Sequence, residues 1–137
     1  MLRWGPLAGK IITGDESAVP KQLIYAIDTN GIVKSFALGI HPEDFDIIPT
    51  NQDLYCVNFN EAQSKILKIS RTVMAKYAGD LLITDAEEVV FPAKLFIVHW
   101  DNATTNFITR SVSLPDSIGG TFEHITFAPI NLPSLTP

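Results

Sequence analysis

Apolar residues occur along this chain in short runs, and clusters of polar turn-forming residues separate the runs. The run KILKIS at residues 65–70 alternates apolar and polar side chains, which is typical of a strand with one buried face. An Asn30-Gly31 step joins the apolar runs at 23–28 and 32–38, and this dipeptide is the strongest short-range signal for a tight hairpin. Because no sustained helical period is present, the pattern predicts an all-β chain of antiparallel hairpins.

Other apolar runs with the same character predict the remaining strands. We expect these strands at residues 10–13, 45–49, 54–59, 95–100, 107–114 and 122–130. The segment RTVMAKY at 71–77 fits one helical turn and a poor outer strand equally well, so both interpretations stay open.

An internal repeat organises these strands. AGKIITGDE at 8–16 is nearly copied by AGDLLITDAEE at 78–88, and QDLYCVNFNE at 52–61 is a looser third version. Each copy opens a unit of about 30 to 45 residues, which is the size of a propeller blade. Two further pairs of segments follow in the same order: LIYAID at 23–28 with LFIVHW at 95–100, and PEDFDIIP at 42–49 with FEHITFAP at 122–129.

The succession PEDFDIIP, DLYCVN and SKILKI resembles the blade motif of NHL-type and gluconolactonase-like six-bladed β-propellers. The resemblance covers nearly the whole chain, from residue 9 to residue 130, and implies the C-terminal half of such a propeller. The implied blades are residues 8–44, 45–78 and 79–121, with 122–130 starting a fourth. The alternative fold is a single β-sandwich or barrel over residues 1–137.

Three blades would leave a sheet edge and one side of the apolar core uncovered. Propellers typically close with about four to eight blades. We therefore expect either a missing N-terminal half that completes the ring or a homo-oligomer in which a second copy does so.

Composition narrows the range of partners and compartments. The formal net charge is -5 and no run of basic residues occurs, which argues against nucleic acid and against an anionic membrane surface as partners. No apolar run approaches the roughly 20 residues of a membrane-spanning helix, and the start of the chain does not resemble a signal peptide. A soluble protein is expected, either cytoplasmic or secreted with its leader absent. The single cysteine, Cys56, lies in an apolar strand and is expected to be a buried thiol.

Acidic residues and histidines stand where the repeat approaches its inner strands. Glu43 and Asp44 lie in one such segment, Glu123 and His124 occupy the corresponding positions in another, and His41 precedes the first. In the gluconolactonase-like families such a ring of groups holds a metal ion, so the resemblance implies a candidate site for Ca²⁺ or another divalent cation. Carboxylate oxygens suit Ca²⁺, whereas a histidine suits a transition metal better. The alternative is that these acids cap turns or pair with basic side chains.

Other polar and aromatic residues have competing structural interpretations. The acids and amides that end the first strand of each unit, Asp15, Asn58 and Asp85, are expected to form turns rather than sites. His99 lies among apolar neighbours and is expected to be a hydrogen-bonded strand residue. Trp4 and Trp100 are candidates for stacking on a ligand such as a sugar, although core packing also accounts for them.

The function that these features favour is non-catalytic: a β-propeller module that binds a protein or small ligand at its channel face. Two alternatives remain open at this point. One is a metal-dependent hydrolase of the lactonase kind, and the other is a carbohydrate-binding propeller.

Overall fold

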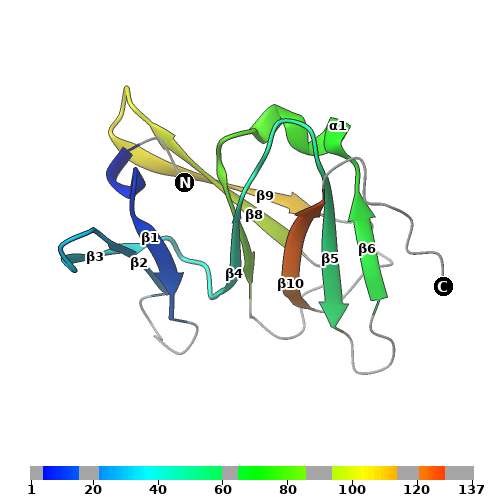
Figure 1. The fold of residues 1–137 in the computed structure, drawn as a ribbon, viewed down its shortest axis with the longest axis horizontal. Coiled ribbons are helices and arrows are strands. Elements are labelled where there is room, and N and C mark those ends of the chain that lie inside the picture. The colour runs from blue at the N-terminus through cyan, green and yellow to red at the C-terminus, as the bar shows by residue number, and fades with distance from the viewer. Residues whose placement is uncertain (1–4, 16–21, 60–64, 86–93, 114–120, 129–137) are drawn as a thin grey trace.

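The computed structural model describes residues 5–15, 22–59, 65–85, 94–113 and 121–128 of the chain (Figure 1). Within these residues the protein is built from antiparallel strands that form three sheets, with one short α-helix. This confirms the predicted all-β class. No sheet of the described residues closes into a barrel. None of the described helices is long and apolar enough to cross a membrane.

Sheet A is an antiparallel meander that follows a short 3-10 helix, η1 (Gly5–Leu7). Its strands are β1 (Ile11–Gly14), β2 (Leu23–Ile27) and β3 (Val33–Ala37). The hairpin between β2 and β3 forms at the predicted Asn-Gly step, where Asp28 Oδ1 accepts hydrogen bonds from the N–H groups of Asn30 and Ile32. Gly31 takes a positive φ of 78°, which a glycine adopts without steric cost.

Sheet B has the order β4-β7-β8-β9, so its first two strands are not consecutive in the chain. Its strands are β4 (Pro42–Ile47), β7 (Leu81–Asp85), β8 (Lys94–Asp101) and β9 (Asn106–Ser113). β4 pairs antiparallel with β7, with Phe45 opposite Ile83, although two other strands and the helix lie between them in the chain.

Sheet C has the order β10-β5-β6. Its strands are β5 (Asp53–Phe59), β6 (Lys65–Ile69) and β10 (Thr121–Ala128). The segment with two open interpretations is helical: α1 (Arg71–Met74) and the 3-10 helix η2 (Ala75–Tyr77) connect β6 to β7.

The sheets do not follow the contiguous units expected from the sequence. The segment 45–78 does not form a sheet of its own, because β4 pairs with β7 while β5 and β6 pair with β10. The looser third copy of the repeat, at 52–61, forms β5, which is the central strand of its sheet. The first copy, at 8–16, forms β1, which is an edge strand. The two closer copies do correspond, since β1-β2-β3 and β7-β8-β9 have the same order and direction.

Sheet B is the central layer of three (Figure 1). Successive residues of a strand point to opposite faces, so Leu81 and Ile83 of β7 face sheet A while Leu82 faces sheet C. β7 is therefore apolar on both faces, as a strand buried on both sides must be. The cluster between sheets A and B consists of Leu7, Ile24, Ala26, Ile40, Leu81, Ile83 and Val98. The cluster between sheets B and C consists of Ile48, Leu54, Cys56, Met74, Leu82, Leu95, Ile97 and Ile125.

Candidate functional site

The strands β4 and β10 lie side by side where sheets B and C meet (Figure 1). We call this region the β4–β10 junction, and it consists of Glu43, Asp44 and Asp46 of β4 with residues 124–127 of β10. It contains the two segments that the repeat had placed in correspondence. The junction therefore brings together strands that are about eighty positions apart in the chain.

Asp44 is the central side chain of the junction. Its Oδ2 accepts a hydrogen bond from the N–H of Ile125 at 3.0 Å, and its Oδ1 accepts one from the N–H of Phe45 at 2.8 Å. Its own N–H donates to Oγ1 of the buried Thr84 on β7 at 2.9 Å. Asp44 therefore has hydrogen bonds to three strands, its own strand β4, the neighbouring β7 and β10 of sheet C. Both of its carboxylate oxygens accept backbone hydrogen bonds.

Asp46 repeats this arrangement two residues further along β4. Its Oδ1 accepts a hydrogen bond from the N–H of Ile47 at 2.7 Å, and its carboxylate also bonds the backbone of Phe127. Alternate residues of a strand present their backbone groups to the same edge, so Ile125 and Phe127 both face β4. Two carboxylates therefore take the place of a backbone ladder between β4 and β10. Burial raises the pKa of Asp46, and the nearby Asp44 raises it further, while the two backbone hydrogen bonds oppose the shift.

His124 lies beside Asp44 on the accessible side of the junction. Its Nδ1 is 3.9 Å from Asp44 Oδ2, and its side chain is 76% exposed, compared with 33% for Asp44. The imidazole can therefore meet a ligand from solvent while the fixed carboxylate stands next to it. This pair provides a hydrogen-bonding or charged contact for a polar group.

The structure brings together part of the predicted metal set. Asp44 and His124 are adjacent, Glu43 precedes Asp44 in β4, and the half-buried His41 lies just before the strand. Glu43 has interactions of its own. The side chain of Glu123 lies outside the described residues. Among the side chains that are described, no three histidine, cysteine or acidic groups are arranged to hold a metal ion.

Trp100, a predicted ligand-stacking residue, packs against other parts of the chain. Its ring meets the ring of Phe107 edge to face with centroids 5.0 Å apart. The Trp100 ring also lies against Gly5, where an added Cβ would stand 2.4 Å from the Trp100 Cγ. Trp100 therefore fastens the 3-10 helix η1 to sheet B. Trp4, the other aromatic candidate, lies outside the described residues.

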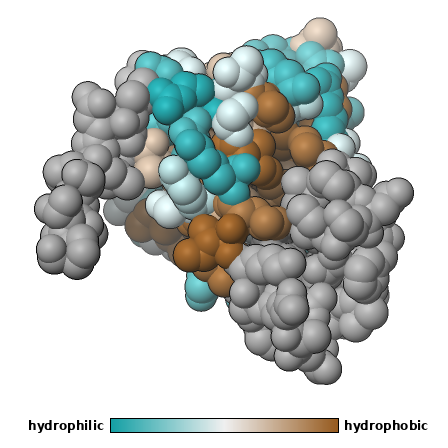
Figure 2. Space-filling model, turned by 90° about the vertical axis from the view of Figure 1, so that its right-hand side faces the viewer, coloured by the Kyte–Doolittle hydropathy of each residue, from teal (hydrophilic) through white to brown (hydrophobic). Residues whose placement is uncertain are grey.

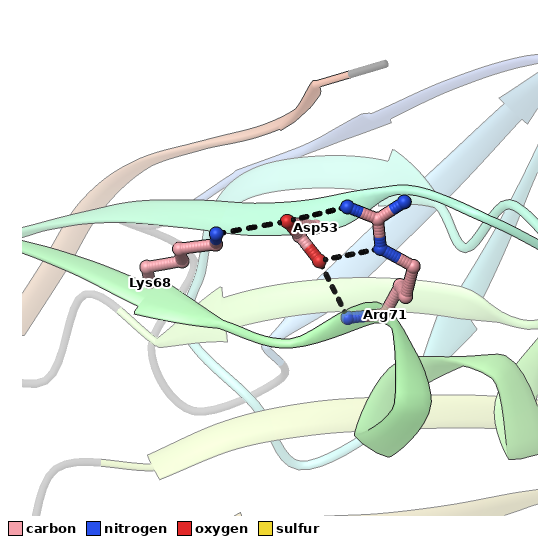
Figure 3. A network of polar contacts seen from close by, with 3 residues as sticks. All are labelled: Asp53, Lys68 and Arg71. Atoms are coloured by element: carbon pink, nitrogen blue, oxygen red, sulfur yellow. Dashed lines mark hydrogen bonds and ion pairs between the residues drawn. The ribbon is translucent and has the colours of Figure 1, made fainter. Parts of the chain in front are cut away.

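A polar network around the buried Asp53, at the start of β5, was not predicted (Figure 3). Asp53 Oδ1 accepts hydrogen bonds from the backbone N–H of Arg71 at 2.8 Å and from its Nε at 3.1 Å. Asp53 Oδ2 is 3.0 Å from a guanidinium nitrogen of Arg71 and 3.0 Å from Lys68 Nζ. Hydrogen bonds from Arg71 and Lys68 hold the pKa of Asp53 well below its ordinary value of 3.8. The network attaches the first residue of α1 to sheet C, which is a structural role.

Two other predicted groups have structural roles as expected. His99 Nδ1 is hydrogen-bonded to Asp80 Oδ1 at 2.7 Å, which confirms the interpretation as a hydrogen-bonded strand histidine. Cys56 is fully buried, and burial raises the pKa of its thiol to about 12, so the nucleophilic thiolate does not form at neutral pH. Asp15 and Asp85 both make contacts at the ends of their strands, while the side chain of Asn58 is not described.

No family model matches the chain, and neither the curated proteins nor the solved structures contain a significant match to it.

Proposed function

We propose that this chain is a non-catalytic β-propeller-type module that binds a protein or a small polar ligand at the β4–β10 junction. The observation that carries the proposal is the adjacency of the exposed His124 imidazole and the fixed Asp44 carboxylate. They come from β4 and β10, the two strands that correspond in the repeat, and equivalent positions of successive blades are arranged around the central channel of a propeller.

The hydrogen bonds of the junction hold its carboxylates in fixed positions. Asp44 accepts a backbone N–H on each oxygen, and Asp46 bonds the backbone of Ile47 and Phe127. Because each carboxylate oxygen can accept more than one hydrogen bond, these groups can still accept one from a polar ligand. The junction therefore offers a rigid polar surface for binding. The buried Cys56 thiol offers no alternative nucleophile.

The test is a screen of small polar compounds by NMR of the ¹⁵N-labelled protein. We expect bound compounds to shift the amide signals of His124, Ile125 and Phe45. We also expect these shifts to disappear in His124→Ala, because this substitution removes the exposed imidazole without touching the backbone hydrogen bonds.

Lys34→Ala supplies the matched control, since Lys34 is exposed on β3 of sheet A. Compounds should bind this variant as they bind the wild type. Shifts that centre on other strands, or that survive His124→Ala unchanged, would reject the junction as the binding site.

A second candidate function is metal-dependent hydrolysis of lactones. The observation in its favour is the 3.9 Å separation of His124 Nδ1 and Asp44 Oδ2, because an imidazole and a carboxylate are both common metal ligands. Calorimetric titration with Ca²⁺ and with Zn²⁺, followed by lactone hydrolysis assays in the presence of each ion, tests this candidate. Glu123→Ala should abolish both binding and activity, and an absence of heat with either ion would exclude the hydrolase.

A further inference from the structure

The strands β4 and β10 correspond in their pairing as well as in their sequence. Phe45 of β4 lies opposite Ile83 of β7, and Ile125 of β10 lies opposite Cys56 of β5. When the copies of the repeat are aligned, Ile83 and Cys56 occupy the same position. Both pairings also contain a register shift shortly before these residues. The same type of strand, which we call a first strand, therefore covers the same edge of sheet B and of sheet C.

Sheet A has no first strand among the described residues. Its order is β1-β2-β3, and β1 is the copy of the repeat that corresponds to β7 and β5. The edge of β1 that faces away from β2 is therefore the edge that β4 covers in sheet B. The N–H of Asp15 donates to the carbonyl oxygen of Leu23 at 3.3 Å, so the alternate residues Ile12 and Gly14 present their backbone groups to the edge away from β2. Such an edge is a template for another strand.

The packing of the sheets repeats in the same way. The first strand β4 packs against β1, as the first strand β10 packs against β7. The two first strands also lie side by side at the β4–β10 junction. A first strand on the edge of β1 would therefore lie beside β4 in the way that β4 lies beside β10.

The two first strands define the kind of segment that fits this edge. Both alternate polar and apolar residues, and the apolar pair Phe45 and Ile47 matches the pair Ile125 and Phe127. In the aligned register, the second apolar residue of a new first strand would lie opposite Ile11. Ile11 is 69% exposed, and a neighbouring apolar side chain would cover part of it.

We propose that β1 accepts an extended segment of a partner polypeptide as a fourth strand of sheet A, antiparallel to β1 and with the polar–apolar alternation of β4 and β10. The described residues place both of their first strands in sheets B and C, so the proposal assigns the third one to a partner. Main-chain hydrogen bonds supply the affinity of such strand addition, and alternate side chains supply its specificity. The site does not depend on a ligand at the β4–β10 junction.

Sheet C presents a strand edge of a different kind at β6. This strand lies on the side of the molecule that Figure 2 views, where apolar surface is visible, and its Ile66 is 74% exposed. β6 follows β5 as β8 follows β7, so the edge of β6 corresponds to the one that β9 covers in sheet B. A first-strand segment should therefore select β1 over β6.

The experiment uses the peptide HPEDFDIIP, which has the sequence of residues 41–49 and is capped at both ends. It is titrated into the ¹⁵N-labelled protein and followed by NMR. We expect saturable binding of one peptide per chain, with shifts centred on the amides of Ile12 and Gly14. Hydrogen exchange of these two amides should become slower in the complex.

Two N-methylated forms of the peptide supply matched controls. In β4 the N–H of Ile48 donates to the carbonyl oxygen of Asp80 on β7 at 3.0 Å, whereas the N–H of Phe45 bonds the Asp44 side chain. Methyl groups on the amide nitrogens of peptide positions 46 and 48 therefore block the bonds to β1 and should weaken binding by about tenfold or more. Methyl groups at positions 45 and 47 lie on the opposite edge of the peptide and should leave the affinity nearly unchanged.

Several results would overturn the proposal. They are the absence of binding, equal weakening by both methylated peptides, and shifts centred on β6 or β7. Slow exchange of Ile12 and Gly14 in the free monomer would show that another segment of this chain already pairs with β1. Protection that grows with protein concentration would show that a second copy does so, and either finding would also reject a partner strand. None of these results bears on the ligand screen, which is read at His124, Ile125 and Phe45.

Discussion

The Asp44 carboxylate accepts a hydrogen bond from the backbone N–H of Ile125 at 3.0 Å and thereby joins two sheets across 81 positions of the chain. A backbone ladder would have made β4 and β10 neighbours in one sheet. With side-chain carboxylates in its place, β4 stays in sheet B and β10 stays in sheet C. The junction is consequently accessible to solvent through His124 and is still held by specific hydrogen bonds.

Asp44→Ala should destabilise the protein by about 1–3 kcal/mol, because it leaves backbone donors of Phe45 and Ile125 without acceptors. Asp44→Asn should lose less stability than Asp44→Ala, since the amide oxygen can still accept one of these hydrogen bonds. Urea denaturation monitored by circular dichroism measures both changes. Thr109→Ala, an exposed position on β9, should change stability by less than about 0.5 kcal/mol. Equal effects of Asp44→Ala and Thr109→Ala would show that the carboxylate does not hold the junction.

Asp53 should contribute to stability at neutral pH and lose that contribution in acid. Its pKa is lowered in the folded state by the hydrogen bonds from Arg71 and Lys68. The folded protein therefore binds the proton less readily than the unfolded chain, so the contribution is complete above the unfolded pKa of 3.8 and falls away below it. Asp53→Asn should be less stable than the wild type at about pH 7, and the difference in their free energies of unfolding should become smaller towards about pH 2. Urea unfolding across this range is the measurement, and a gap independent of pH would contradict the expectation.

Asp46 should have the opposite dependence on pH, because burial raises its pKa above the ordinary value of 3.8. Here the folded state binds the proton more tightly than the unfolded chain. Stability should therefore rise as the pH falls through the folded pKa towards 3.8, relative to a variant that cannot titrate. Asp46→Asn is that variant, and the wild type should gain stability against it between about pH 7 and pH 4. An NMR titration of the Asp46 carboxyl should give the folded pKa directly. A pKa at or below 3.8 would contradict the prediction.

Local contacts explain which parts of the fold the sequence could predict. The β2–β3 hairpin depends on Asn30 and Gly31, and its hydrogen bonds to Asp28 span only a few residues. The pairing of β4 with β7 depends on Phe45 and Ile83, which are separated by two strands and a helix in the chain. No local pattern in the sequence indicates that β4 pairs with β7 and not with β5, the next strand along the chain. The sequence therefore predicted contiguous units that the structure does not have.

The same distinction applies to the polar residues. The adjacency of Asp44 and His124 could be anticipated because the repeat placed their segments in correspondence. The network of Asp53, Lys68 and Arg71 could not, because its members lie on β5, β6 and α1 and share no motif. A carboxylate at the start of a strand is common in sequences, and only the tertiary fold brings the guanidinium to it.

Gly14 of β1 allows sheet A to approach β4. A Cβ at this position would stand 2.5 Å from Pro42 Cγ and 2.7 Å from Phe45 Cζ, closer than side chains tolerate. The corresponding residue of sheet B is Thr84, whose hydroxyl instead accepts the N–H of Asp44. We expect Gly14→Ala to destabilise the protein by about 1–3 kcal/mol through overpacking, measured by urea denaturation.

Phe45→Leu should relieve part of this cost, because the shorter side chain vacates the position of the Phe45 Cζ. The double variant Gly14→Ala with Phe45→Leu should then lose less stability than the two single variants added together, and the difference is their coupling energy. Gly31→Ala is the control, since a Cβ there meets nothing within 4 Å and its cost comes from the positive φ alone. Its effect should add to that of Phe45→Leu without coupling. Strict additivity of Gly14→Ala and Phe45→Leu would show that the Gly14 contact with β4 does not set the packing of sheet A.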